Sequence, residues 1–255
     1  QVHSVCASSP WWTRLVGAGP LSPSAHFLPK NPRMEPAPVT TFMRHASGEK
    51  GPVAMAMSIG RWSADRPTHQ SASGKPVLHW AHANGFNAQT YDPLLAPLAG
   101  DFDVYAADAR GHGFSTLTAD PVHYPGWDRY RDDLIFVLEH LCDKAGGKIW
   151  LGGHSMGGCA SVMASALRPD LVAGLVLTDP VIMPRTARVI ARMLFRAQGG
   201  FILAKNAAKR RADWPDADTV KNAYTGRGAF QTWQDGFLGA YVDGGLRPLH
   251  GCAEN

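Results

Sequence analysis

Segments with the hydrophobic pattern of a strand and segments with that of a helix alternate along the middle of the chain. Short, nearly continuous apolar runs are typical of buried strands, and each is followed by a glycine-rich loop or a turn. Between two such runs, Tyr130–Cys142 carries its apolar residues at helical spacing. The expected strands lie within Val53–Trp62, Gly74–Phe86, Phe102–Ser115, the start of Lys148–Leu167, and Leu171–Pro180. Strands that alternate with helices predict an α/β fold with a mostly parallel sheet covered on both faces.

Glycine-rich loops follow three of the expected strands, after Ala81, Ala107 and Leu151. Ligands of open parallel sheets bind where strands reach their carboxyl ends. These three loops are therefore the expected surroundings of a site.

The chain divides into three parts by composition. Residues 1–33 are rich in Pro, Ser and Gly, show no strand or helix period, and lack the continuous apolar core of a signal peptide. Because the first methionine is Met34, we expect a disordered or non-native extension at 1–33. We expect a folded α/β core at 34–180, and a separate helical segment with the C-terminal tail at 181–255.

Composition and charge narrow the class of protein. A chain of 255 residues that is 45% hydrophobic can bury a sizeable core as one domain. No apolar run is long enough to form an integral membrane segment. The net charge of +4 includes three cations in residues 1–33, so nucleic acid is not an expected partner. Four cysteines without metal or redox spacing favour a reducing, cytoplasmic location.

Glycines surround a single serine in the stretch "KIWLGGHSMGGCASVMASAL". Gly153-His154-Ser155-Met156-Gly157 fits the pattern G-x-S-x-G, the signature of a nucleophile elbow between a strand and a helix. Such a serine is held in a strained conformation that requires small neighbours. The sequence therefore predicts a strand-to-helix turn with positive φ at Ser155, and a catalytic Ser155 nucleophile beside the positive end of a helix.

Three motifs together resemble the α/β-hydrolase superfamily. They are "HWAHANGF", "DARGHGFS" and "GGHSMGG", and the resemblance extends over roughly Thr41 to Pro248. It implies a three-layer α/β/α sandwich with a helical lid, and an oxyanion hole made by the backbone N–H groups of Met156 and Asn84. It also implies a small-molecule acyl or ester substrate, and neither a metal nor an organic cofactor.

Other residues of these motifs are expected to have structural roles. His82 and His112 are expected to hydrogen-bond their loops, and the side chain of His154 to point away from the reaction centre. Asp108 and Arg110 are expected to hold their loop by a charge-assisted bond. Cys159 is expected to be a small core residue.

The segment after Val181 resembles the lid that family members insert after the sixth strand. Arginines at three- and four-residue spacing predict a basic helix stripe, either a solvated face or a surface that attracts an acidic ligand, membrane or partner. They are Arg185, Arg188, Arg192 and Arg196. The aromatic residues expected to face the pocket are Tyr224, Phe230, Trp233, Phe237 and Tyr241.

The general base and the acid are the least evident parts of the pattern. A serine nucleophile needs a base and an orienting acid, which in this fold follow the serine in the order acid, then histidine. His250 is the one histidine after Ser155, and Asp179 is a candidate acid, with a helix cap or pocket wall as its alternative role. We expect a carboxy-truncated chain without the last strands, and self-association through an exposed sheet edge at Leu171–Thr178.

These observations predict a serine hydrolase that cleaves a carboxylic ester or a related acyl bond. An acyltransferase or a carbon–carbon bond hydrolase on the same fold is the first alternative, since all can use the same serine. A catalytically impaired fragment or a ligand-binding protein is the second. Substrate identity depends on lid packing and does not follow from the sequence.

Overall fold

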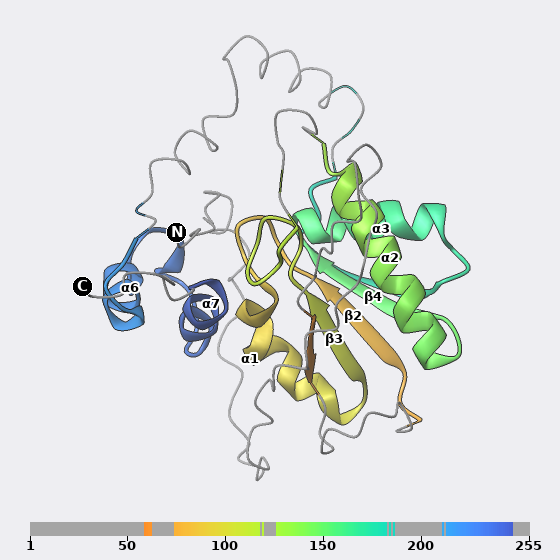
Figure 1. The fold of residues 1–255 in the computed structure, drawn as a ribbon, viewed down its shortest axis with the longest axis horizontal. Helices are drawn as coiled ribbons and strands as arrows, with labels where there is room; N and C mark the ends of the chain where they lie inside the picture. Colours follow the sequence, from red (N-terminus) through yellow and green to blue (C-terminus); the bar gives the residue numbers. More distant parts are fainter. Residues whose placement is uncertain are drawn as a thin grey trace, which may run out of the picture.

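A five-stranded sheet forms the central layer of the described structure (Figure 1). The computed structural model describes residues 59–62, 74–117, 119, 126–182, 184, 186, 211 and 213–246. The strands follow the order β1-β3-β2-β4-β5. Their bounds are Ile59–Trp62 for β1, Val77–Ala81 for β2, Asp103–Ala107 for β3, Ile149–His154 for β4 and Val172–Thr178 for β5. All neighbouring pairs are parallel except β1 with β3, so the predicted mostly parallel sheet is confirmed.

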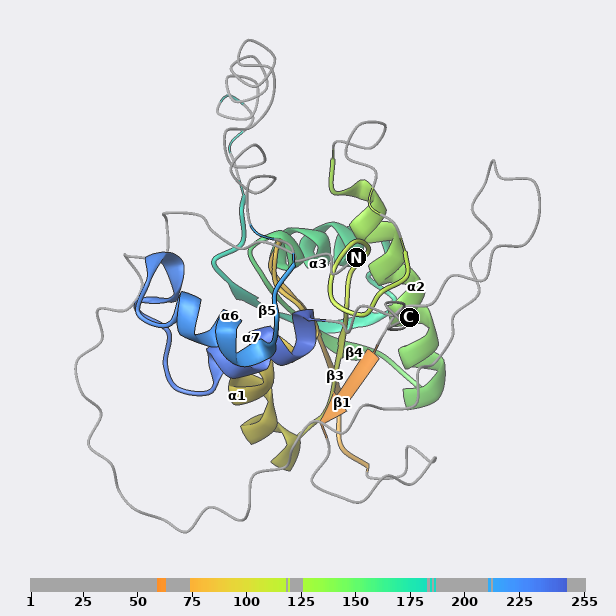
Figure 2. The ribbon, with the colours of Figure 1, turned by 60° about the vertical axis from the view of Figure 1, so that its left-hand side comes forward.

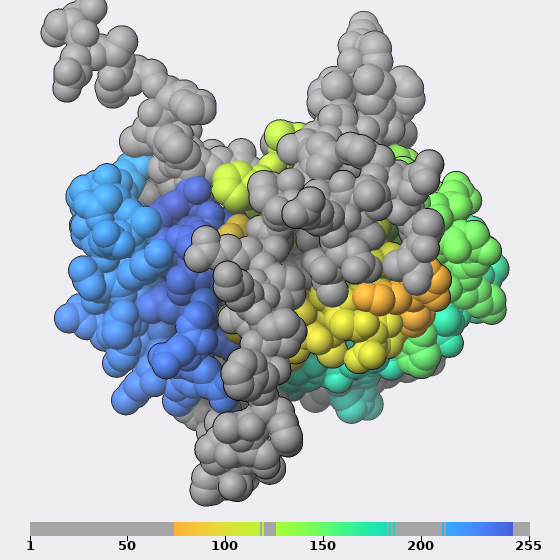
Figure 3. All heavy atoms as spheres, turned by 90° about the horizontal axis from the view of Figure 1, so that it is seen from below, coloured from red at the N-terminus to blue at the C-terminus, as the bar shows by residue number. Residues whose placement is uncertain are grey.

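Helices cover both faces of the sheet, which gives the predicted three layers (Figures 1 and 2). One face carries α2, Asp128–Ala145, and α3, Met156–Leu167. The other face carries η2, Ala88–Tyr91; α1, Asp92–Leu95; and η3, Ala96–Gly100. The C-terminal elements α6, Ala217–Tyr224; η4, Gly228–Phe230; and α7, Phe237–Gly245, pack on this second face. Figure 3 shows them in blue, gathered on one side of the molecule.

Successive residues of β2 belong alternately to two hydrophobic cores, one on each face of the sheet. Val77 and Ala81 face the layer of α2 and α3, whereas Leu78 and Trp80 face the layer of α1. This alternation is the two-residue period of a strand buried on both faces. The helical spacing predicted for α2 is also confirmed, because the four apolar positions on which the prediction rests are at most 6% exposed. These positions are Leu134, Val137, Leu138 and Leu141.

The edge strand β5 differs from the other parallel strands in its exposure. Leu175 is 38% exposed and Val176 47%, although both lie in an apolar run. In the part of the chain that the structure describes, β5 pairs with β4 and with no second strand. Both faces and one edge of this strand therefore remain accessible.

None of the described helices combines the length and the apolar character needed to cross a bilayer. Residues 1–33, all four arginines of the stripe and His250 lie outside the described residues. The predictions made for them therefore stay predictions.

Candidate active site

Ser155 lies where the chain passes from β4 into α3. Its φ is 52° and its ψ is −113°, so it occupies the positive-φ region that side chains rarely adopt. Its N–H donates to the Thr178 carbonyl oxygen at 3.1 Å, and its own carbonyl oxygen accepts from the Cys159 N–H at 3.0 Å. The half-buried Ser155 side chain makes no capping hydrogen bond to α3. The predicted turn and positive φ are confirmed, and the hydroxyl is not committed to the helix.

Two glycines beside Ser155 permit this turn. A Cβ on Gly153 would lie 2.6 Å from the Gly157 carbonyl oxygen, closer than real Cβ atoms come to a neighbour. A Cβ on Gly157 would overlap the carbonyl group of Ala81 at the end of β2. The absent side chains therefore let the start of α3 press against β2. This close approach brings α3 next to the loop that begins at His82.

The two backbone N–H groups expected to form the oxyanion hole both belong to described residues. Met156 is the first residue of α3, and first-turn N–H groups have no acceptor within their own helix. Asn84 lies in a tight turn closed by the Phe86 N–H, which donates to the Ala83 carbonyl oxygen at 3.1 Å. The N–H groups on either side are used, since that of Ala83 donates to Tyr91 Oη and that of Gly85 to a histidine, each at 3.0 Å. The Asn84 N–H lies between these two groups, and the described residues provide no hydrogen-bond acceptor for it.

The histidine at the start of this loop has the predicted structural role. His82 Nδ1 lies 2.8 Å from the Ala83 carbonyl oxygen, and His82 Nε2 accepts from the Ala109 N–H at 2.9 Å. Nδ1 must therefore be the nitrogen that carries the proton. Burial lowers the pKa of His82 to about 3. A neutral His82 thus joins the loops after β2 and β3.

His112 joins the same two loops from the other side. Its Nδ1 lies 2.8 Å from the Arg110 carbonyl oxygen, and its Nε2 accepts from the Gly85 N–H at 3.0 Å. Burial lowers the pKa of His112 as well. The predicted loop-stabilising role is confirmed, and this imidazole has no ring nitrogen left to act as a base.

Asp108 and Arg110 hold their loop through other partners than expected. The Asp108 carboxylate accepts 2.8 Å hydrogen bonds from the N–H groups of Ala88 and Phe114. Arg110 forms a two-point ion pair with Asp133 of α2, at 2.6 and 2.8 Å. The prediction of charge-assisted bonds was right, but it missed α2, because nothing in the motif indicates which helix lies beside the loop.

Asp179 follows β5 immediately and is exposed, with a φ of 42°. Strand register pairs His154 with Thr178, so Asp179 lies beside Ser155 at the carboxyl edge of the sheet. No helix begins within residues 179–182, so the alternative role of helix cap is wrong. The structure places Asp179 near the serine turn, while His250 lies outside the described residues.

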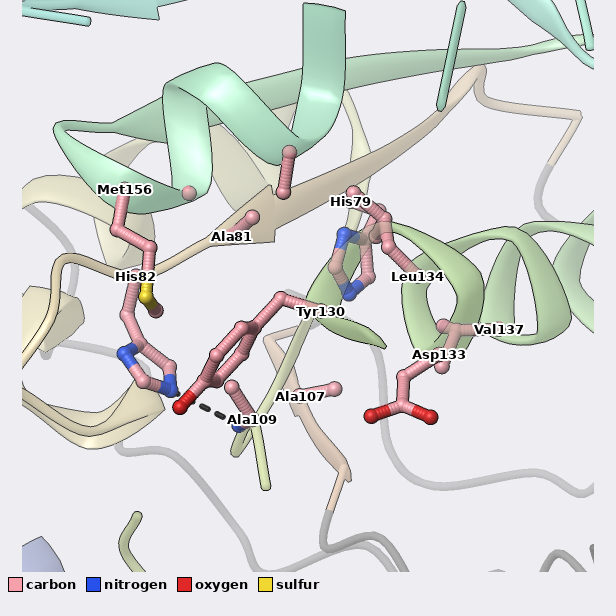
Figure 4. A pocket seen from close by; sticks show the side chains of 12 residues that line it. His79, Ala81, His82, Ala107, Ala109, Tyr130, Asp133, Leu134, Val137 and Met156 are labelled. Atoms are coloured by element: carbon pink, nitrogen blue, oxygen red, sulfur yellow. Dashed lines mark hydrogen bonds between the residues drawn. The ribbon is translucent and has the colours of Figure 1, made fainter. Parts of the chain in front are cut away.

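A small cavity lies directly behind the start of α3 (Figure 4). Its volume is about 30 Å³, and its lining includes Met156, Gly157 and Tyr130. His79 points into it from β2 and is 1% exposed, and neither ring nitrogen has a hydrogen-bond partner among the described residues. This space suits a single water molecule and is too small for an acyl substrate.

The aromatic residues expected in the lid form a packed cluster. Phe230 is 7% and Tyr241 8% exposed, and the Tyr224 ring stacks on Phe230 with centroids 4.7 Å apart. Phe86, which follows the Asn84 turn, contacts Trp233 edge-on at 5.3 Å. The cluster therefore packs on the core through Phe86, and the expectation that these residues face the substrate pocket stays a prediction.

Possible metal-ligating side chains are scattered in the described part of the chain. No three His, Cys, Asp or Glu side chains come together among the described residues.

Cys159 is buried as predicted, and its Sγ lies 2.8 Å from the Val181 carbonyl oxygen. Burial raises the pKa of both the Cys142 and the Cys159 thiol.

Comparison with known proteins places this geometry among hydrolases. The family model described as "Serine aminopeptidase, S33" matches residues 73–220. A serine hydrolase-like protein from Danio rerio is 37% identical over 142 residues, which are 55% of this chain and 40% of that protein. Human monoglyceride lipase is 33% identical over 113 residues, 43% of this chain and 36% of the lipase. The chain thus spans less than half the length of these curated relatives.

A solved structure shares the arrangement of elements. The crystal structure of E-2-(acetamidomethylene)succinate hydrolase superposes with a TM-score of 0.53 at 25% sequence identity. The match covers 76% of this chain and 65% of that one. The predicted fold is therefore confirmed by an independent structure.

Proposed function

The chain belongs to the serine aminopeptidase S33 family of α/β hydrolases, and we propose that it is a serine hydrolase that cleaves a carboxylic ester or a related acyl bond of a small molecule. The observation that carries the proposal is the backbone at Ser155, with its positive φ between β4 and α3. A non-glycine residue with such a φ is costly to maintain and is found where a site requires it. The hydrolase names of the relatives support the same class of reaction.

The proposed reaction begins with attack of Ser155 Oγ on the carbonyl carbon of the substrate. The carbonyl oxygen becomes an oxyanion, which the N–H groups of Met156 and Asn84 stabilise together with the positive end of the α3 dipole. A general base takes the serine proton and returns it to the leaving group, which departs as an alcohol or amine. Water then attacks the acyl-serine, and the acid product leaves.

Asp179 and His250 are proposed as the acid and the base. Three buried histidines are unsuited to the base role, because burial lowers the pKa of His79 and His82 to about 3 and that of His154 to about 4. Asp179 is supported by its exposed position beside the serine turn. His250 is supported by chain order, since it follows both Ser155 and Asp179.

Covalent labelling tests the nucleophile. A fluorophosphonate probe is expected to label the wild-type chain once, as Ser155 Oγ displaces fluoride from phosphorus. Ser155→Ala is expected to abolish the label, measured by mass spectrometry. Ser165→Ala is the matched control, because Ser165 lies on α3 and donates its hydroxyl to the Val162 carbonyl oxygen at 2.9 Å. A label that survives in Ser155→Ala would disprove the assignment.

Rates of ester hydrolysis separate the base from the acid. Loss of the base in a serine hydrolase costs up to about 10⁶ in kcat, and loss of the acid about 10⁴. His250→Ala is therefore expected to reduce ester hydrolysis more than Asp179→Asn. Unchanged hydrolysis in either variant would remove that residue from the proposed triad.

We also propose that the chain self-associates through β5. Leu175 and Val176 are exposed, and unpaired apolar edge strands recruit other chains.

The free thiols of Cys142 and Cys159 suit the reducing, cytoplasmic location proposed for the protein.

Analytical ultracentrifugation tests this association. The wild-type chain is expected to show concentration-dependent oligomers, and the double variant Leu175→Lys/Val176→Lys to shift toward monomer, because inserted charges disfavour pairing of edges. Leu94→Lys is the control, since Leu94 is 42% exposed at α1, away from β5. A monomer at all concentrations would contradict association through this edge.

A further inference from the structure

The hydroxyl of Tyr91 lies between the two segments that bear the proposed oxyanion donors. Tyr91 Oη is 3.0 Å from the N–H nitrogen of Ala83, the residue before Asn84. It is also 2.6 Å from His154 Nδ1, and His154 is the residue before Ser155. One hydroxyl therefore bridges the loop after β2 and the end of β4.

One hydrogen bond of this bridge has a fixed direction. A backbone N–H can only donate, so Tyr91 Oη accepts from Ala83. In the Nε2–H tautomer of His154, the hydroxyl proton of Tyr91 is given to His154 Nδ1 at 2.6 Å. Burial lowers the pKa of His154 to about 4 and raises that of Tyr91, so both side chains are neutral near pH 7. The bridge therefore joins two uncharged side chains.

Packing holds the Tyr91 ring in place. The side chain is 5% exposed, and its ring lies 5.6 Å from that of Trp80 and 5.9 Å from that of His154. The turn of η2 that carries it is closed by a capping box, in which Asn87 Oδ1 accepts from the Thr90 N–H at 2.8 Å. A hydroxyl held so rigidly can set the distance between the segments that it joins.

We propose that Tyr91 is a positioning residue that fixes the Asn84 turn against the start of α3, and thereby sets the spacing of the two N–H groups of the oxyanion hole. The inference deepens the proposed hydrolase function and rests on it. Asn84 is one residue from the bridge on one side, and Met156 two residues on the other. Preorganised donors of this kind stabilise a transition state only where their spacing is held.

Tyr91→Phe is the informative substitution. It keeps the aromatic ring and its packing, but leaves the Ala83 N–H and His154 Nδ1 without their partner. Tyr105→Phe is the matched control, because Tyr105 is also a buried tyrosine but belongs to the core on the opposite face of the sheet.

Amide hydrogen exchange tests the positioning without requiring activity. In Tyr91→Phe, the hydrogen-bonded amides of Ala83, of Phe86 in the Asn84 turn and of Cys159 in the first turn of α3 are expected to exchange about tenfold faster, the equivalent of one lost hydrogen bond. In Tyr105→Phe they are expected to keep the wild-type rates. Acceleration at Ala83 alone would show that the hydroxyl acts only locally, and would overturn the proposal.

Steady-state kinetics supply the second readout. For an ester substrate, Tyr91→Phe is expected to lower kcat about 10- to 100-fold with KM changed less than about threefold, because misplaced donors act in the transition state. An equal loss through KM would overturn the positioning role. A wild-type chain that neither labels nor hydrolyses would overturn the hydrolase function instead, and the exchange rates would still decide whether Tyr91 couples the two segments.

Discussion

Replacing Gly157 with alanine is expected to destabilise the protein by about 3 kcal/mol or more and to lower fluorophosphonate labelling at least about 100-fold. The added Cβ would overlap the Ala81 carbonyl group and lie 2.6 Å from the His82 carbonyl oxygen. Both obstacles are backbone atoms, which cannot rotate away as a side chain would. The start of α3 must therefore move off β2, and the N–H of Met156 moves with it.

The control for this substitution is Gly239→Ala in α7. Nothing lies within 4 Å of a Cβ built on Gly239, which is inside the helix Phe237–Gly245. Alanine there is expected to stabilise the protein by about 1 kcal/mol, because it raises helix propensity. Urea-unfolding midpoints and labelling rates of the two variants are the measurements. Wild-type stability and labelling in Gly157→Ala would disprove the account of the turn.

Local sequence patterns predicted most of the sheet and the serine turn. The apolar run before Ser155 and the small residues after it act within a few positions of one another, so β4, the turn and the start of α3 followed directly from the sequence. The spacing in α2 is equally local, although the helix extends to Asp128–Ala145, past both ends of the predicted segment. Gly146, with a φ of 70°, ends it.

Contacts between distant segments were not predictable in this way. The bridge from Tyr91 to His154 spans 63 residues and depends on strand order, because β2 and β4 must be neighbours for it to form. The ion pair of Arg110 with Asp133 depends in the same way on where α2 packs. No motif marks Tyr91 or Asp133, and each was identified from its partners in space.

Acidification is expected to unfold the protein between about pH 4 and pH 5, well before most carboxylates are protonated. Burial lowers the pKa of His79 and His82 to about 3 and that of His154 to about 4, from an ordinary value of 6.5. Below pH 6.5 the unfolded chain binds a proton at each of these positions, whereas the folded chain does not until its own lower pKa is reached. Stability therefore falls as the pH falls through this window.

The expected slope is steep because three histidines act together. Each contributes about 1.4 kcal/mol per pH unit, so the free energy of unfolding is expected to fall by about 4 kcal/mol per unit between pH 6 and pH 4. The loss over two units is about 8 kcal/mol, which exceeds the stability of a domain in the lower part of the usual range of about 5–15 kcal/mol. The lowered carboxyl pKa values of Asp170 and Asp216 also favour the folded state, but that contribution is lost only below about pH 4.

Urea titrations from pH 8 to pH 4, followed by tryptophan fluorescence, measure this slope, and His79→Leu identifies its source. The leucine removes two buried ring nitrogens that have no hydrogen-bond partner among the described residues, so little stability is lost near pH 7. Below pH 6 the variant is expected to lose stability about a quarter to a third more slowly than wild type, since one of the four buried histidines whose pKa is lowered among the described residues is gone. An unchanged slope in His79→Leu, or a wild-type stability that is flat down to pH 4, would show that the buried imidazoles do not control the acid transition.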